Sequence, residues 1–75
     1  MSKLPLLSAK ELFKILRKLG FENIRQEGSH AFFRHPDGRT TIVPVHPTED
    51  IDRGLLNKIV KKDINISREQ FMRHL

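Results

Sequence analysis

The chain has 75 residues and carries 14 Lys and Arg against 9 Asp and Glu, a net charge of +5, with no cysteine. Without cysteine there is no disulfide, thiolate nucleophile or cysteine-based zinc site, and a domain this small buries only ~60% of its unfolded surface, which leaves little room for an internal cofactor. Because no apolar run approaches the ~18 residues that cross a bilayer and the N-terminus lacks a signal-peptide core, we expect one cytoplasmic domain over residues 1–75, without a cofactor, whose surface side chains do its chemistry.

The first predicted element is an amphipathic helix that begins after Ser8. Ser8 and Glu11 have the spacing of a capping box, and Gly20 supplies the positive φ that ends a helix. Its apolar residues recur at helical spacing: Leu12, Ile15, Leu16 and Leu19. Its basic residues fall on another face: Lys10, Lys14, Arg17 and Lys18. With Lys3, residues 1–20 hold the chain's basic excess, so this face is either an RNA-binding surface or a merely solvated one.

Three strands are predicted next, over residues 21–26, 31–35 and 40–45. Gly28 breaks the first pair, and the segment Pro36-Asp37-Gly38-Arg39 favours a tight hairpin turn. Pro44 lacks an N–H, so we place it at a sheet edge or near the end of its strand.

A second helix is predicted from near Asp52. Its apolar face is Leu55, Leu56, Ile59 and Val60, with the lysines facing away: Lys58, Lys61 and Lys62. Ser67 and Gln70 form another capping box before a short C-terminal helix that packs Phe71 and Leu75. The order α-β-β-β-α predicts an α+β fold, with two helices on one face of a three-stranded antiparallel sheet and the other face open.

His30 follows the Gly28-Ser29 turn at the start of the second strand. The period of two places Phe32 and Arg34 on its face. If that face is exposed, it suits RNA, because a base can stack on Phe32, a phosphate can pair with Arg34 and the imidazole can exchange protons.

The opposite assignment remains open from these residues. If Phe32 belongs to the core in place of Phe33, His30 is a half-buried spacer. The residues alone favour neither assignment.

The other histidines have weaker signals. His46 is either a second proton-transfer group or, as we favour, a structural residue that hydrogen-bonds a loop. We expect His35 and His74 to be solvent-exposed bystanders. No two histidines have the i, i+4 spacing of a helical metal site, and no cluster of carboxylates completes one, so we predict no metal.

Several segments in this order resemble the HicA family of toxins over nearly the whole chain. These segments are Leu19-Gly20-Phe21, Gly28-Ser29-His30, Arg34-His35-Pro36-Asp37-Gly38-Arg39, Thr41-Ile42-Val43-Pro44-Val45-His46 and Arg53-Gly54. The resemblance implies a fold like the double-stranded-RNA-binding domain, an mRNA interferase activity with His30 as catalytic histidine, and control by a HicB-like antitoxin. The chain has Ala31 where many members have a second histidine, and Leu55 where many have threonine.

The chemistry of RNA cleavage fits these residues, because RNA supplies its own nucleophile in the 2′-hydroxyl. His30 is the expected general base, and Arg34 or a lysine would stabilise the phosphate charge. Gly28, Ser29 and His46 are candidate accessory residues, and the general acid is unassigned between His46, a lysine and water. A non-catalytic RNA-binding module and a protein-interaction subunit are the alternatives.

Overall fold

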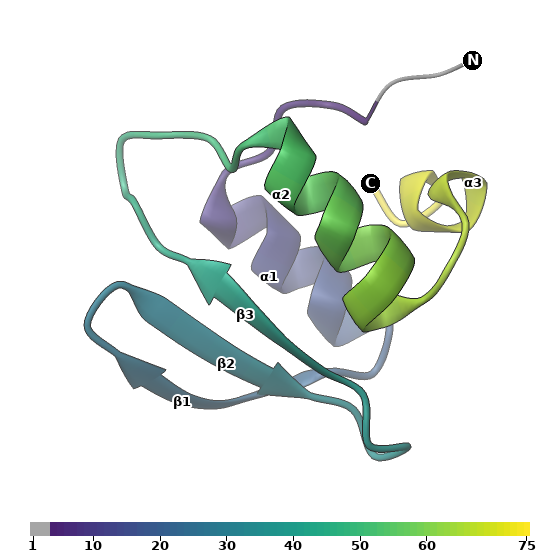
Figure 1. Ribbon diagram of the computed structural model, residues 1–75, viewed down its shortest axis with the longest axis horizontal. Helices are drawn as coiled ribbons and strands as arrows, with labels where there is room; N and C mark the ends of the chain where they lie inside the picture. Colours follow the sequence, from purple (N-terminus) through teal and green to yellow (C-terminus); the bar gives the residue numbers. More distant parts are fainter. Residues whose placement is uncertain (1–3) are drawn as a thin grey trace.

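The computed structural model describes residues 4–75, so Lys3 lies outside the described residues. The elements in chain order are α1 (Ala9–Lys18), β1 (Glu22–Glu27), β2 (His30–Arg34), β3 (Thr40–Pro44), α2 (Arg53–Lys58), the π-helix η1 (Ile59–Ile64) and α3 (Arg68–Met72). The strands pair antiparallel in the order β1-β2-β3, and α1 and α2 lie over one side of this sheet (Figure 1). The predicted α+β arrangement is therefore confirmed, with strand ends shifted by about one residue.

The first helix begins and ends as the sequence predicts. The Glu11 N–H donates to the Ser8 hydroxyl at 3.2 Å, and the Ser8 N–H donates to the Glu11 carboxylate at 3.0 Å. This second bond is the main cause that lowers the pKa of Glu11 below its usual value. Gly20 has φ +97° just after the helix. The capping box and the glycine thus fix where the chain leaves α1 for the sheet.

The second helix differs from its prediction in its winding. The Leu55 N–H donates to the Asp52 carboxylate at 3.1 Å, which caps α2 as expected. From Ile59 onward, however, the chain winds as a π-helix and ends at Asn65, which has φ 59°. The predicted helix is therefore present with its apolar face buried and its lysines exposed, but the sequence pattern did not predict the change of winding at Ile59. The last turn of η1 is hydrogen-bonded by Arg39 of the β2–β3 hairpin and by Thr41 of β3. Sequence periodicity does not predict such contacts between distant residues.

The hydrophobic core lies between the sheet and the helices. Phe33 of β2 is fully buried and its ring centre lies 4.9 Å from that of Phe13 on α1. Phe71 of α3 is fully buried too, as predicted, but Leu75 is 56% exposed, so its predicted packing was wrong. Within residues 4–75, no helix is both long enough and apolar enough to span a membrane.

Candidate nucleic-acid interface

His30 is the first residue of β2 and points away from the helices. The neighbouring residues Ala31 and Phe33 are both 0% exposed on the inner face of the sheet. His30 and Arg34 are therefore on the outer face and exposed, with the half-buried Phe32 between them. The structure thus decides between the two assignments of β2, and Phe33 belongs to the core.

The buried position of Ala31 also bears on the family pattern. A second histidine at this position would face the helices across the sheet from His30. Its absence therefore removes no group from the outer face.

The turn before His30 is set by backbone geometry. Gly28 has φ +58°, in the left-handed region that favours glycine, although a Cβ there would meet no atom within 4 Å. The Ser29 carbonyl accepts a hydrogen bond from the Val45 N–H at 2.6 Å. The turn that presents His30 is thus joined to the segment that follows β3.

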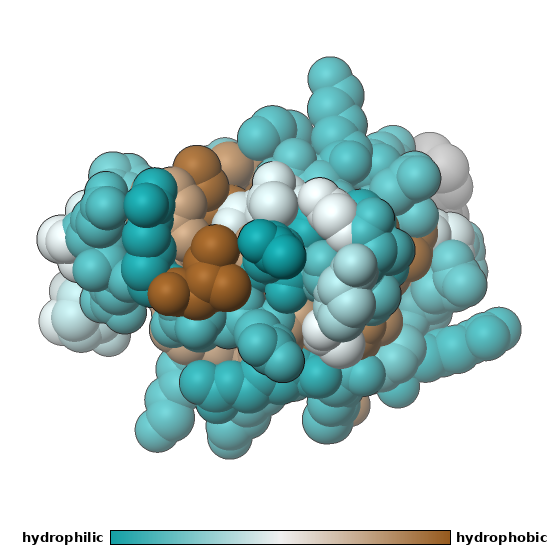
Figure 2. All heavy atoms as spheres, turned by 90° about the horizontal axis from the view of Figure 1, so that it is seen from below, coloured by the Kyte–Doolittle hydropathy of each residue, from teal (hydrophilic) through white to brown (hydrophobic). Residues whose placement is uncertain are grey.

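The outer face beside His30 is partly apolar. Ile42 is 46% exposed and lies opposite Phe32 in the strand pairing. Ile24, 53% exposed, lies at the register shift of β1, next to Arg25, which pairs with Phe32. Figure 2, a view from below, shows apolar side chains gathered in a small patch surrounded by hydrophilic ones. Phe32 is not a bare platform, because the guanidinium of Arg25 lies over its ring at 4.4 Å from the centroid.

The basic face of α1 is exposed as predicted, but it is not beside His30. Its residues are Lys10, Lys14, Arg17 and Lys18. Because α1 packs on the inner face of the sheet through Phe13 and Phe33, its solvent face and the outer sheet face lie on different sides of the molecule. The structure therefore separates the two surfaces that the sequence suggested for RNA.

His46 lies in the segment after β3, exposed to solvent. It lines a cavity of about 250 Å³. The other lining residues are Pro44, Glu49, Asp50, Ile51, Asp52 and Leu55. The His46 carbonyl accepts from the Glu49 N–H, but its imidazole makes no hydrogen bond with any residue from 4 to 75. The hydrogen bond to a loop that we expected for this ring is therefore not present.

Within residues 4–75, no three His, Cys, Asp or Glu side chains are grouped to hold a metal ion.

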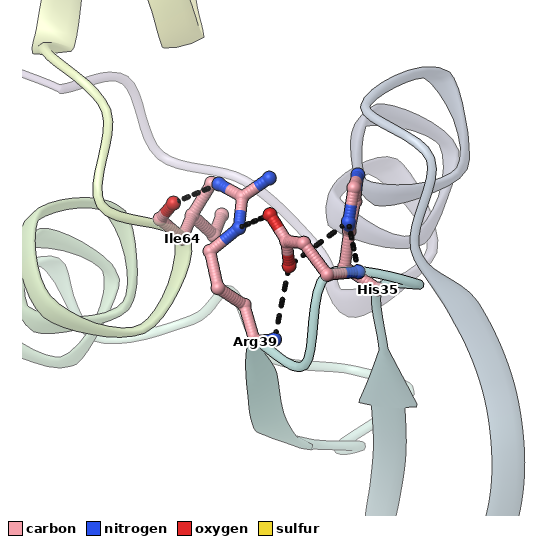
Figure 3. Close-up of polar contacts among 4 residues, drawn as sticks. His35, Arg39 and Ile64 are labelled. Atoms are coloured by element: carbon pink, nitrogen blue, oxygen red, sulfur yellow. Dashed lines mark hydrogen bonds and ion pairs between the residues drawn. The ribbon is translucent and has the colours of Figure 1, made fainter.

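His35 is not the exposed bystander that the sequence suggested. Its ring packs edge-on against Phe21 with centroids 5.1 Å apart, and its side chain is 22% exposed. The Asp37 N–H donates to His35 Nδ1 at 3.1 Å, and the Arg39 N–H and Nε donate to the Asp37 carboxylate at 3.0 and 2.8 Å. Arg39 also donates to the Ile64 carbonyl (Figure 3). The hairpin tip is thereby tied to the connection between α1 and β1, through Phe21, and to η1, through Ile64.

The same contacts set the charge of Asp37. Its pKa lies below the usual value chiefly because the backbone N–H of Arg39 bonds its carboxylate, with further help from the Arg39 side chain. Asp37 thus stabilises the hairpin in its ionised form.

His74 was also predicted to be a bystander, and it too has a partner. Its Nδ1 lies 2.9 Å from the Gln70 carbonyl oxygen, one helical turn back. The i, i+4 spacing was visible in the sequence, whereas the contact of His35 with Phe21 joins two separate loops, the hairpin tip and the connection between α1 and β1, and left no local signal.

Residues 9–66 match the model of the family described as the HicA toxin of bacterial toxin-antitoxin systems. The matched range runs from the start of α1 to just beyond η1 and contains the whole sheet. No curated protein matches the chain.

Proposed function

Because the chain belongs to the HicA toxins of bacterial toxin-antitoxin systems, we propose that it is an mRNA interferase that cleaves messenger RNA and arrests growth. The observation that carries this proposal is the exposed His30 on the outer sheet face, with Arg34 two residues away on the same face. An imidazole accessible to a polymer substrate is what a general base for RNA cleavage requires.

The proposed chemistry uses the 2′-hydroxyl of RNA as the nucleophile. A neutral His30 accepts its proton, which for a positioned base contributes ~10²–10⁴-fold in rate. Arg34 stabilises the charge that develops on the phosphate. Since RNA provides the nucleophile, the step needs no metal-bound water, and the expected product is a 2′,3′-cyclic phosphate or its hydrolysis product.

A toxin of such a system has an antitoxin partner. We propose a HicB-like antitoxin that covers His30 and the neighbouring apolar patch of Ile24 and Ile42, whose exposure a partner would remove. The place of action would be the cytoplasm, where messenger RNA is translated.

The test compares the native protein with His30→Gln, which keeps the size and polarity of the side chain. We expect His30→Gln to lose RNA cleavage and growth arrest while keeping its circular dichroism spectrum and unfolding midpoint. His74→Gln, a change at the helix-bound histidine, is the matched control and should remain toxic. EDTA should leave cleavage by the native protein unchanged.

Two results would contradict the proposal. A fully toxic His30→Gln would remove His30 from the mechanism. A native protein that binds RNA without cleaving it, with equal affinity in His30→Gln, would support the alternative of a non-catalytic RNA-binding module.

A further inference from the structure

Cleavage of RNA needs an acid as well as a base, because the departing 5′-oxygen must gain a proton. The assignment of this general acid rests on the proposed function. The strand pairing limits where it can lie: His30 is paired with Pro44 of β3, and the ladder continues one residue further through the bond from the Val45 N–H to the Ser29 carbonyl at 2.6 Å.

His46 lies two residues after Pro44, just beyond the end of β3. The bond at Val45 extends the pairing past Pro44, and continued alternation of the side chains would put His46 on the side of Pro44, where His30 lies. Diagonal neighbours of this kind have Cα atoms ~7–8 Å apart. Each of the two rings must lie ~2.6–3.2 Å from its own oxygen of the scissile linkage, so side chains at this spacing can reach opposite sides of one phosphate.

The surroundings of His46 suit a group that meets substrate. Its imidazole makes no hydrogen bond or ion pair with residues 4–75, whereas the rings of His35 and His74 are both engaged. It lines the cavity of about 250 Å³ together with Pro44, the residue paired with His30. Sites for drug-sized ligands span ~300–1,000 Å³, so this smaller cavity limits its occupant to a group no larger than one nucleoside.

The charges around the cavity are compatible with a protonated ring. The acidic residues that line it are Glu49, Asp50 and Asp52, of which Asp52 also accepts from the Leu55 N–H, and His30 lies beyond Pro44. Apart from His46 itself, none of the lining residues is basic.

We propose that His46 is the general acid of the cleavage, donating its proton to the leaving 5′-oxygen, whose nucleoside lodges in the adjoining cavity. His30 takes the proton of the 2′-hydroxyl, the 2′-oxygen bonds to phosphorus and the bond from phosphorus to the 5′-oxygen breaks. The products are a 2′,3′-cyclic phosphate and a 5′-hydroxyl, with one proton gained by His30 and one lost by His46.

The test uses two RNA oligonucleotides that carry the same mapped cleavage site. One is ordinary RNA, and the other has sulfur in place of the bridging 5′-oxygen, which leaves as a thiolate without needing a proton. In single-turnover assays, His46→Gln should cleave ordinary RNA ~10²–10⁴-fold more slowly than the native protein, yet cleave the sulfur substrate within a few-fold of the native rate. His30→Gln should be slow on both substrates. Thr48→Ala, in the same loop, should change neither rate.

Other outcomes overturn the assignment. Equal slowing of His46→Gln on both substrates would make His46 a structural or binding residue, and native rates on both would remove it from the reaction, while cleavage by the native protein would leave the proposed function standing. If the native protein cleaves neither substrate, the nuclease function itself fails. Unfolding midpoints and RNA affinities of each variant show that the fold is kept.

Discussion

The guanidinium carbon of Arg25 lies 4.4 Å from the centre of the Phe32 ring, so a cation already covers the aromatic surface nearest His30. Contacts of this kind at exposed sites contribute ~0.5–1 kcal/mol. A base that stacks here must displace Arg25 or stack on the guanidinium plane, and RNA-binding proteins use aromatic rings and arginine planes in this way. We therefore expect the two side chains to contact RNA as one surface.

Phe32→Leu should weaken binding of single-stranded RNA. Stacking of one base is worth ~1–3 kcal/mol, which corresponds to about 5- to 150-fold in affinity. Because Phe32 is only half buried, the unfolding midpoint should change little. Fluorescence anisotropy with a labelled oligonucleotide measures the affinity, and Ile42→Val on the same face is the control. Unchanged affinity in Phe32→Leu would exclude stacking at this position.

Gly20 and His35 constrain one another at the end of α1. A Cβ on Gly20 would lie 2.9 Å from His35 Nε2, whereas a Cβ on Gly38 would meet no atom within 4 Å, and both glycines have similar positive φ, +97° and +99°. Gly38→Ala should therefore show the conformational cost alone, ~1–2 kcal/mol, and Gly20→Ala a larger loss of unfolding free energy. Urea unfolding measures both.

The double variant separates the contact from the backbone strain. In a His35→Ala background, the cost of Gly20→Ala should fall to that of Gly38→Ala. If the two alanine variants cost the same in the native background, the contact with His35 contributes nothing.

Most of the fold could be predicted from residues that are close together in the sequence. The two capping boxes and the glycine after α1 fixed helix ends because each depends on residues within one turn. The alternation along β2 gave the two faces of the strand, but only the packing of Phe33 against Phe13 showed which one is buried.

What the sequence missed depends on contacts between distant segments. In η1, the Asp63 carboxylate accepts a hydrogen bond from the Thr41 hydroxyl of β3 at 2.9 Å, and these two residues are 22 positions apart in the chain. His35 likewise gains its role from Phe21, in the connection between α1 and β1. The basic face of α1 was visible, but its separation from His30 requires the layer order.

Asp37 should make the stability of the protein depend on pH at the acid end. Its folded pKa lies below the usual value of 3.8 because the Arg39 N–H bonds the carboxylate. The ionised group therefore stabilises the fold above its unfolded pKa, and this contribution is lost as the pH falls through the lower folded pKa. Native protein should exceed Asp37→Asn in unfolding free energy at neutral pH, and the difference should shrink in acid.

Urea unfolding over a pH series measures this difference. Glu49→Gln is the control, since its carboxylate has no hydrogen bond with residues 4–75. Some acid dependence should persist in Asp37→Asn, because the pKa of Glu11 is lowered as well. A difference that stays constant down to the acid end would show that Asp37 acts through packing and not through its charge.

An antitoxin partner should compete with RNA for the outer sheet face. Its binding should abolish cleavage and slow hydrogen exchange around Ile24 and within residues 28–46, because we propose that it covers His30 and the exposed side chains of Ile24 and Ile42. Charged surfaces steer association, and salt screens exposed charges beyond ~8 Å at physiological strength, so added salt should slow association more than it speeds dissociation. A co-purified partner that leaves nuclease activity undiminished would contradict this assignment.

The basic face of α1 should contribute to RNA affinity and not to the cleavage step. Lys14 and Lys18 are exposed on the far side of the sheet from His30, so Lys14→Gln with Lys18→Gln should weaken binding without changing the single-turnover rate at saturating RNA. Each lost phosphate contact reduces the steepness of the plot of log affinity against log salt by ~0.7 for single-stranded RNA. The loss of both lysines should therefore reduce the steepness by about 1.4. The control changes two exposed lysines of η1, Lys61→Gln with Lys62→Gln, and keeps the same net charge as the test variant. An equal drop in slope for the control would show that RNA responds to the overall charge of the protein and that α1 is no specific binding surface.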